Sequence, residues 1–180
     1  MNNTVSPSDA ILAACFPLLS QNPGASMADI AKAAGIGRAT LHRHFASRDA
    51  LVVALCRAAM TEIDSAIDAA TANATSHTEA LRLSIDALIP LAHRMTFLGY
   101  MASDDPDLAA EYSRSDAEMH ATIDAAKAEG TFDPHVPTPW INATCEALVY
   151  AAWDMVLAEE ATPNQAAAHV WRTLTKGLAP

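Results

Sequence analysis

The sequence has 180 residues, of which 51% are hydrophobic and 18% charged, and its formal net charge is −10. This length and apolar content allow one domain with its own core, or a small module attached to a larger one. The three cysteines, Cys15, Cys56 and Cys145, are odd in number and lie among apolar neighbours, which excludes a disulfide framework and indicates reduced core thiols.

The amino-terminal third predicts three short helices and then a long one. Residues 6–9 combine a cap, a proline at the first helical position and an acidic residue, so a first helix starts there. Pro17 removes the backbone hydrogen bond to Ala13, and we expect the helix to kink or end early. Residues 26–29 form a capping box for a short second helix that Gly35 stops. A third helix follows Gly37, and Ser47 caps a long fourth.

The rest of the chain also predicts helices, with no useful strand-like alternation. The polar stretch 71–76 ends the fourth helix, the next starts at Thr78, and Pro90 kinks it or starts another. Residues 104–106 form a turn and cap before a polar amphipathic helix that runs to Glu129. After a loop over 130–137, two final helices start near Thr138 and Pro163.

The segment 140–158 holds fifteen apolar residues in nineteen, and its four polar residues do not share one helical face. Such a helix must be covered on several sides. Glu146 and Asp154 would be expensive in lipid, and no basic flank precedes the segment, so no membrane span is expected. A helix that meets both its own core and a partner subunit fits the pattern better.

The second and third helices, joined at Gly35, have the pattern of a helix-turn-helix between residues 26 and 45. In this motif the second helix enters the major groove, so the first is short, the turn is sharp and few apolar residues fix the angle. On the third helix Leu41 and Phe45 face inward, at about 300° and 340° from Arg38. We therefore expect DNA contacts from the opposite face of this helix and its flanks, by Arg38, Ala39, Thr40, His42, Arg43 and His44. Arg48, beside the amino end of the next helix, suits a phosphate contact.

The charge of the chain is unevenly distributed. Residues 1–60 hold five basic and three acidic side chains, whereas residues 61–180 hold six and eighteen. A local positive face can therefore coexist with an acidic body. Ordinary surface scatter is the alternative interpretation of these few charges, and the surrounding motif favours DNA binding.

Residues 26–31, 34–36, 39–45 and 47–51 resemble the TetR family of bacterial transcriptional regulators, strongly over about residues 8–55. Beyond these residues the resemblance rests on helix count and on segments 128–132 and 174–178. Two departures stand out. Gly37 occupies the position of the usual capping Ser or Thr, and His42 that of the usual tyrosine.

The resemblance implies an all-α fold in which a three-helix helix-turn-helix domain is joined by the long fourth helix to a helical bundle. Residues 1–55 would bind DNA, and residues 56–180 would bind an effector and dimerise. The expected function is a transcriptional repressor released by a small molecule. It would act in the cytoplasm, because the amino terminus lacks both the basic start and the apolar run of a secretory signal.

Two further sets of residues follow from this interpretation. Aromatic and methionine residues beside scattered polar groups suggest a cavity for a mostly apolar effector, lined by Phe97, Tyr100, Met101, Tyr112, Met119, Ile123, Trp140, Thr144 and Tyr150. Plain core packing is the alternative for each of them. The two final helices predict a homodimer interface that includes Cys145, Leu148, Ala152, Val156, Val170, Trp171 and Leu174.

The alternative class is a helical small-molecule-binding protein or enzyme without a DNA role. It explains the acidic second part equally well, but not the basic residues around the Gly35 turn. The sequence contains no Gly-rich phosphate loop, HExxH or GxSxG, so no enzyme and no cofactor are expected. His42 and His44 are two residues apart on a helix and point to different faces, so no metal site is expected either.

Overall fold

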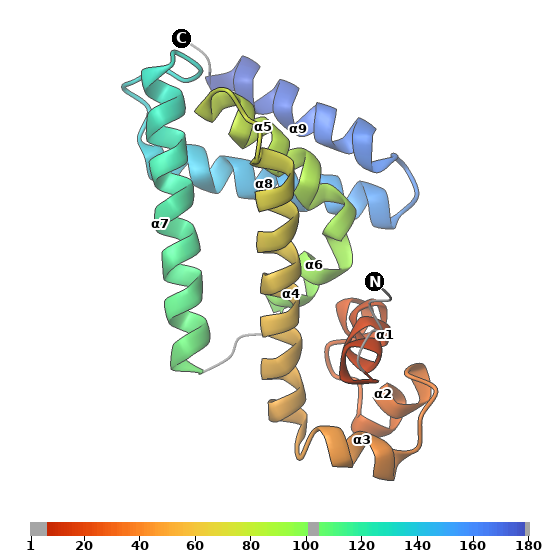
Figure 1. The fold of residues 1–180 in the computed structure, drawn as a ribbon. Coiled ribbons are helices and arrows are strands. Elements are labelled where there is room, and N and C mark those ends of the chain that lie inside the picture. The colour runs from red at the N-terminus through yellow and green to blue at the C-terminus, as the bar shows by residue number, and fades with distance from the viewer. Residues whose placement is uncertain (1–6, 101–104, 179–180) are drawn as a thin grey trace. The chain divides into compact units, whose positions relative to one another are not determined.

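The computed structural model describes residues 7–100 and 105–178, which form helices and no strand (Figure 1). The predicted all-α class, with a helix-turn-helix near the amino terminus, is confirmed. In chain order the elements are α1 (Pro7–Gln21), α2 (Met27–Ala33), α3 (Arg38–His44), α4 (Arg48–Thr71), α5 (His77–Leu88), the 3₁₀ helix η1 (Ile89–Leu91), α6 (Ala92–Tyr100), α7 (Pro106–Ala128), α8 (Thr138–Leu157) and α9 (Pro163–Leu178).

By their internal contacts the residues fall into two compact units. The first comprises residues 1–62 and 93–109, and the second residues 63–92 and 110–180. The first unit therefore takes its residues from two separate stretches of the chain.

Helix α1 continues through Pro17 to Gln21, so of the two outcomes expected at Pro17, a kink or an early end, the early end does not occur. A proline frees the carbonyl four residues earlier, here that of Ala13. Both residues are exposed, so solvent can satisfy this carbonyl. Phe16 and Leu19, on the opposite face, are buried and hold the helix against the core.

The helix starts in the first unit lie where the capping residues predict them. Ser26 and Asp29 form the expected capping box: Asp29 N–H donates to Ser26 Oγ at 3.3 Å, and Ser26 N–H donates to Asp29 Oδ2 at 3.0 Å. Ser47 Oγ accepts the N–H of Ala50 at 3.1 Å, so α4 begins at Arg48. Gly37 is the N-cap of α3 and provides no side-chain hydrogen bond, as its identity predicts.

A single hydrophobic cluster holds the first unit together. It joins α1, α2, α3 and the first half of α4, and Leu41 and Leu51 are fully buried in it. Phe97 of α6 and Leu108 of α7 are buried in the same cluster. Cys15 and Cys56 also lie there as free thiols, and burial raises the pKa of each to about 11.

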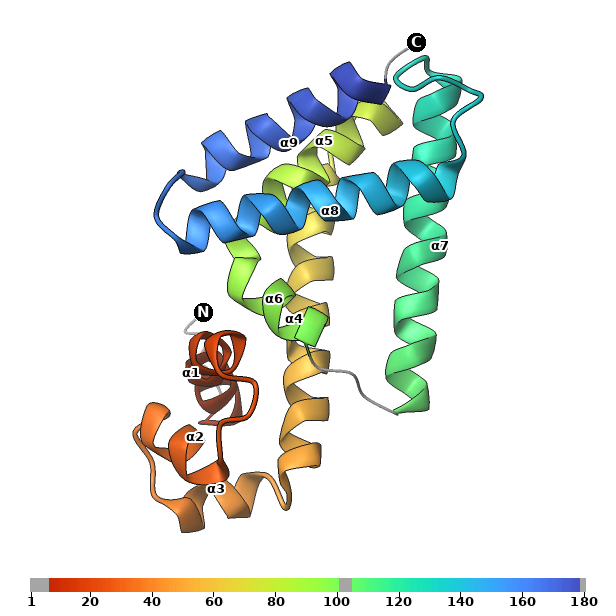
Figure 2. The ribbon, with the colours of Figure 1, turned by 180° about the vertical axis from the view of Figure 1, so that it is seen from behind.

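In the second unit α8 runs alongside α9, and α5 packs against α9 (Figures 1 and 2). Trp153 of α8 is buried, and its indole N–H donates to the carbonyl of Leu88 at 3.2 Å. Lys127 near the end of α7 donates to the Val136 carbonyl at 2.9 Å, which fixes the loop before α8. None of the described helices combines the length and apolar character needed to cross a membrane.

Candidate DNA-binding and effector sites

The turn between α2 and α3 is fixed by a glycine in the left-handed region. Gly35 has φ +66°, a conformation that side chains with a Cβ adopt at a cost. The N–H of Ile36 donates to the Ala31 carbonyl at 2.9 Å, and that of Gly35 to the Lys32 carbonyl at 3.1 Å. This pair of bonds is the Schellman ending of a helix, and it sets the sharp angle that a helix-turn-helix requires.

The outer face of α3 is open to a ligand. Leu41 and Phe45 are buried beneath it, as their spacing predicts. Of the predicted DNA contacts on this helix, Thr40 is half-buried and the others are exposed, namely Arg38, Ala39, His42, Arg43 and His44. The structure therefore brings these six residues together on one short helix, three of whose side chains are basic or imidazole groups near its end.

Arg48, the seventh predicted contact, has a role in the structure that its position in the sequence does not reveal. Its guanidinium donates a hydrogen bond to the Pro23 carbonyl in the loop between α1 and α2, and the side chain is half-buried. Arg48 thus ties the start of α4 to the loop before α2. A guanidinium has five N–H donors, so others remain for a phosphate.

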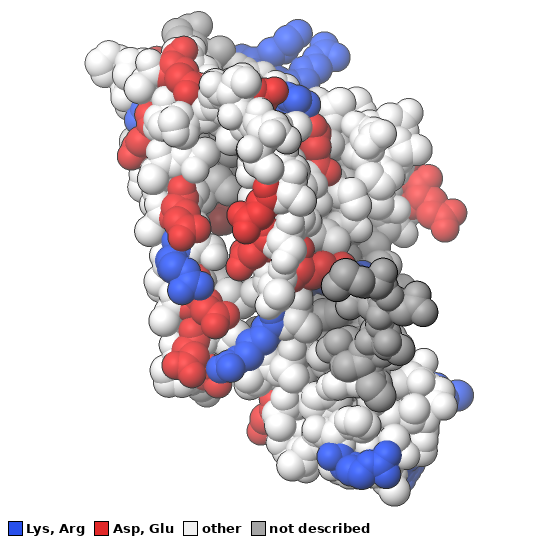
Figure 3. All heavy atoms as spheres, in the orientation of Figure 1, with Lys and Arg blue, Asp and Glu red and all other residues white. Residues whose placement is uncertain are grey.

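In Figure 3, basic side chains are visible at the end of the first unit that carries α2 and α3. Lys32 in the last turn of α2 is exposed on this unit and was not among the predicted contacts. Its place on the helix that crosses the DNA backbone in a helix-turn-helix suits a phosphate contact. Sequence analysis could have predicted this phosphate contact, because Lys32 lies on the first helix of the motif.

The predicted dimer residues divide into two groups. Cys145, Ala152, Val170 and Leu174 are buried within the chain's own core. Leu148, Val156 and Trp171 are half-exposed, and α8 also exposes residues that the prediction missed. Trp140 is 63% exposed and Leu157 38%, unusual values for large apolar side chains.

The exposed and half-exposed residues of α8 include an apolar row at helical spacing. The row consists of Trp140, Ala147, Leu148, Ala151 and Met155. Between α8 and α9 lies a shallow groove lined by Leu148, Ala151, Ala152, Met155, Ala166, His169, Val170 and Thr173. Exposed apolar patches of this kind are common at protein–protein interfaces.

The predicted effector residues are distributed over both units. Phe97 is fully buried in the core of the first unit, where its ring meets that of Phe16. Ile123 is also fully buried, in the second unit, while Tyr112, Trp140 and Tyr150 are exposed and Met119 and Thr144 half-buried. The Tyr150 ring contacts Trp153 edge-on, with centroids 5.0 Å apart. Met101 and the side chain of Tyr100 lie outside the described residues.

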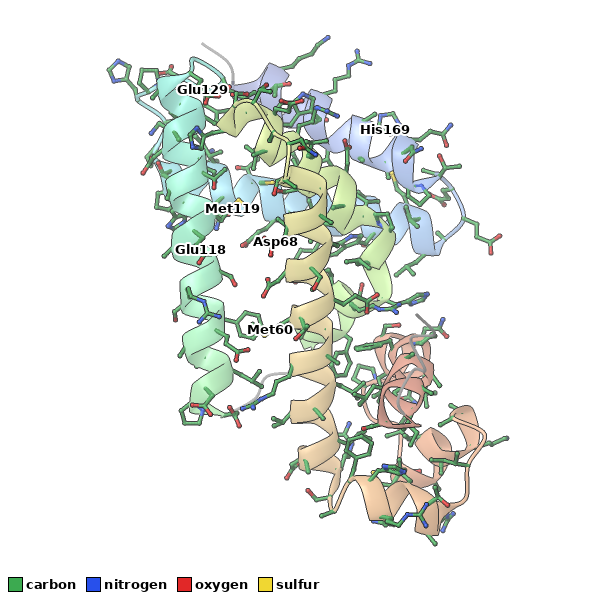
Figure 4. The ribbon with its side chains drawn as sticks, in the orientation of Figure 1. Met60, Asp68, Glu118, Met119, Glu129 and His169 are labelled. Carbon is green, nitrogen blue, oxygen red and sulfur yellow. The ribbon has the colours of Figure 1, made fainter. Side chains whose placement is uncertain are left out.

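Acidic side chains of α4 and α7 influence one another in the second unit. Burial and the neighbouring carboxylates of Asp68, Glu118 and Glu111 raise the pKa of Asp64, while Arg114 lowers it. In Figure 4, Asp68 of α4 and Met119 of α7 point into the space between these helices. In the described part of the chain no group of three or more His, Cys, Asp or Glu side chains is arranged to hold a metal ion.

A capped short helix, a glycine turn and an exposed basic helix define a helix-turn-helix DNA-binding regulator. Residues 11–55 match the family model described as bacterial regulatory proteins, tetR family. The chain is 31% identical over 172 residues to the HTH-type transcriptional repressor LfrR of Mycolicibacterium smegmatis, covering 94% of this chain and 88% of that protein. The chain belongs to the TetR family, so the expected family and the expected class, a transcriptional regulator and not an enzyme, are confirmed.

Solved structures agree with this assignment. The crystal structure of LfrR from Mycobacterium smegmatis in complex with proflavine matches with a TM-score of 0.76 at 27% identity, covering 97% of this chain and 98% of that one. The ketosteroid regulator KstR2 of Mycobacterium tuberculosis matches with a TM-score of 0.80 at 14% identity, covering 97% and 96%. The second likeness concerns the fold alone.

Proposed function

We propose that the protein represses transcription in the cytoplasm as a homodimer that holds one α3 in each half-site of a double-stranded operator, and that a small molecule releases it. Residues 1–55 provide the DNA contacts, and residues 56–180 dimerise and bind the effector. The observation that carries this proposal is the exposed outer face of α3 beside the Gly35 turn.

Arg43 and Thr40 read bases, because they lie near the middle of that face, whereas Arg48 and Lys32 contact phosphates. Phosphate contacts set the register of a protein on DNA, and base contacts set its choice of sequence. The second unit is acidic, so the affinity depends on these few local contacts and falls steeply with salt.

The dimer forms through α8 and α9. A single helix-turn-helix reads too few base pairs for useful specificity, whereas a twofold dimer reads two half-sites. The support is the row of uncovered apolar side chains on α8, with Trp140 at one end and the groove against α9 at the other. A second copy that buries this face would remove the exposed apolar surface from water.

The effector is a largely apolar, planar aromatic cation, and it binds in the second unit between α4 and α7. The similar repressor LfrR has been solved with proflavine, which has this chemistry. Asp64 and Asp68 of α4 and Glu118 of α7 supply negative charge, and the half-buried Met119 supplies apolar surface. A cation among these carboxylates offsets their mutual repulsion.

A gel shift of the full chain with DNA flanking its own gene tests the proposal, with and without proflavine. The proposal predicts a salt-sensitive shift that survives excess unrelated DNA and weakens when proflavine is added. Binding that unrelated DNA removes completely would contradict sequence-specific repression. Operator affinity that proflavine leaves unchanged, although it binds the protein, would contradict release by this class of effector.

A further inference from the structure

Residues 93–109 are structurally part of the first unit, although the chain on both sides of them belongs to the second. Phe97 and Leu108 from this stretch are 0% and 1% exposed, in the cluster formed by α1 to α4. The rings of Phe97 and Phe16 pack edge-on, with centroids 5.5 Å apart. Without these two side chains the core of the first unit would be incomplete.

Arg94, in the first turn of α6, contacts two of the other helices of this unit at once. Its Nε donates to Glu62 Oε2 of α4 at 2.9 Å. Its guanidinium carbon also lies 5.0 Å from the centroid of the Phe16 ring of α1, within cation–π range. Arg94 therefore joins α1 to α4 through α6.

Neighbouring contacts support the same junction. His93 Nδ1 and Ser20 Oγ of α1 are hydrogen-bonded at 3.0 Å, and Ser20 is itself buried. Farther along, Arg57 of α4 lies 3.5 Å from the carboxylates of both Asp105 and Asp107. Residues 93–109 are thus held to α1 and to α4 by separate polar contacts.

The Arg94–Glu62 pair is poorly suited to a purely stabilising role. Its side chains are 25% and 43% exposed, and ion pairs with this exposure add little to stability. A planar guanidinium that is stacked on a ring and paired with a carboxylate does, however, restrict the relative direction of the helices that carry these two groups. The contact therefore constrains the angle between α1 and the part of α4 that carries Glu62.

We propose that Arg94 is a positioning residue that fixes this angle and thereby the distance between the two recognition helices of the dimer. The proposal rests on the proposed function. Helix α3 ends at His44 and α4 begins at Arg48, so only three residues join them and the direction of α3 is linked to that of α4 within the first unit. In a twofold dimer that direction sets the half-site spacing that the protein accepts.

The test measures spacing preference and not affinity alone. The operator is first selected from random duplexes with the wild-type full chain, and variants are then made with one base pair added or removed between the half-sites. One base pair rotates the half-sites by about 34°, since a turn holds about 10.5 base pairs. Wild type should lose at least about tenfold in affinity on the altered spacers, whereas Arg94→Met should lose about threefold or less.

Arg82→Met is the matched control, because Arg82 forms an exposed ion pair with Asp86 within α5 of the second unit. It should keep the wild-type spacing preference. Glu62→Gln keeps the shape of the side chain that pairs with Arg94 but removes its charge, so it should partly relax the preference for the wild-type half-site spacing. If Arg94→Met does not fold, Glu62→Gln takes its place in the test. Melting temperatures separate positioning from simple loss of stability.

Two results would overturn the inference. Either Arg94→Met binds the operators of every spacer length more weakly by one common factor, or it discriminates between spacer lengths as wild type does. Failure of the wild-type chain to select any operator is a different result. It would reject the proposed function, and the role of Arg94 with it.

Discussion

The carboxylate of Glu129, just past the end of α7, accepts both the backbone N–H and the hydroxyl of Thr78 in the first turn of α5, at 2.9 and 2.7 Å. The other carboxylate oxygen accepts the backbone N–H of His77 at 2.8 Å. Glu129 therefore caps a helix that begins 52 residues earlier in the chain. These hydrogen bonds, chiefly those of Thr78, lower its pKa from the ordinary 4.5 to about 2.

This cap predicts acid sensitivity of the second unit. A carboxyl whose pKa is depressed in the folded state stabilises the fold above its unfolded pKa, and that contribution is lost as the pH falls toward the folded value. The melting temperature should therefore fall between about pH 5 and pH 2, and Glu129→Gln should flatten part of that fall. Scanning calorimetry across this range measures the effect.

Glu160→Gln is the matched control, because Glu160 is exposed near the end of α8. The melting temperature of Glu160→Gln should fall with decreasing pH as steeply as that of the wild-type chain. Identical pH profiles for Glu129→Gln and wild type would show that the cap contributes nothing.

Glu159, after the C-cap of α8, adopts a left-handed conformation with φ 59° that favours glycine. Its N–H donates to the Val156 carbonyl and that of Glu160 to the Met155 carbonyl, a Schellman ending. Glu159→Gly should stabilise the fold by about 0.5–1 kcal/mol and raise the melting temperature by about 1–3 °C. Glu160→Gly is the control and should give no such gain. A lower melting temperature for Glu159→Gly would contradict this account of the turn.

The dimer surface predicts a position-specific response to charge. Ala151 is exposed and lines the groove between α8 and α9. Ala151→Glu should yield a monomer at micromolar concentration and remove operator binding, because an unpaired charge at the centre of an interface is costly. Ala121→Glu, at an exposed position of α7, should remain a dimer. Sedimentation velocity distinguishes them, and a stable monomer for the wild-type chain would refute the interface.

The cluster of acidic side chains between α4 and α7 predicts charge-dependent effector binding. Asp64→Asn should weaken proflavine binding by about twofold to fivefold, as for one partly exposed charge pair. Asp154→Asn, on an exposed position of α8, should leave binding unchanged. Fluorescence titration measures both. Equal proflavine affinity in Asp64→Asn and wild type would remove this carboxylate from the site.

The sequence could predict the features that depend on neighbouring residues. Caps such as Ser26 and Ser47 mark helix starts because a side chain bonds a backbone N–H three residues away, and Gly35 marks the turn through its own conformation. Contacts between distant residues carry no such local signal. The bond from Arg48 to Pro23 is one example, and the capping of α5 by Glu129 is another.

Phe97 shows why apolar residues were harder to place. The sequence suggests that Phe97 lines an effector cavity, with plain core packing as the alternative, and its helical spacing does not indicate which core it joins. In the structure Phe97 is buried in the cluster formed by α1 to α4. This placement depends on the tertiary contacts of residues 93–109. The division of α8 residues between core and exposed surface, as with Ala152 and Trp140, was hidden for the same reason, since the helix is apolar nearly all round.

Fluorescence anisotropy of the full chain on two duplexes tests directly whether α3 reads DNA sequence. One is the selected operator, and the other has the same length and composition in scrambled order. Wild type should prefer the operator by about a thousandfold or more. Arg43→Ala should lose about 1–3 kcal/mol on the operator and little on the scrambled duplex, whereas Lys32→Ala should weaken both about equally. Equal wild-type affinity for the two duplexes, or an equal loss on both in Arg43→Ala, would contradict the base-reading role of α3.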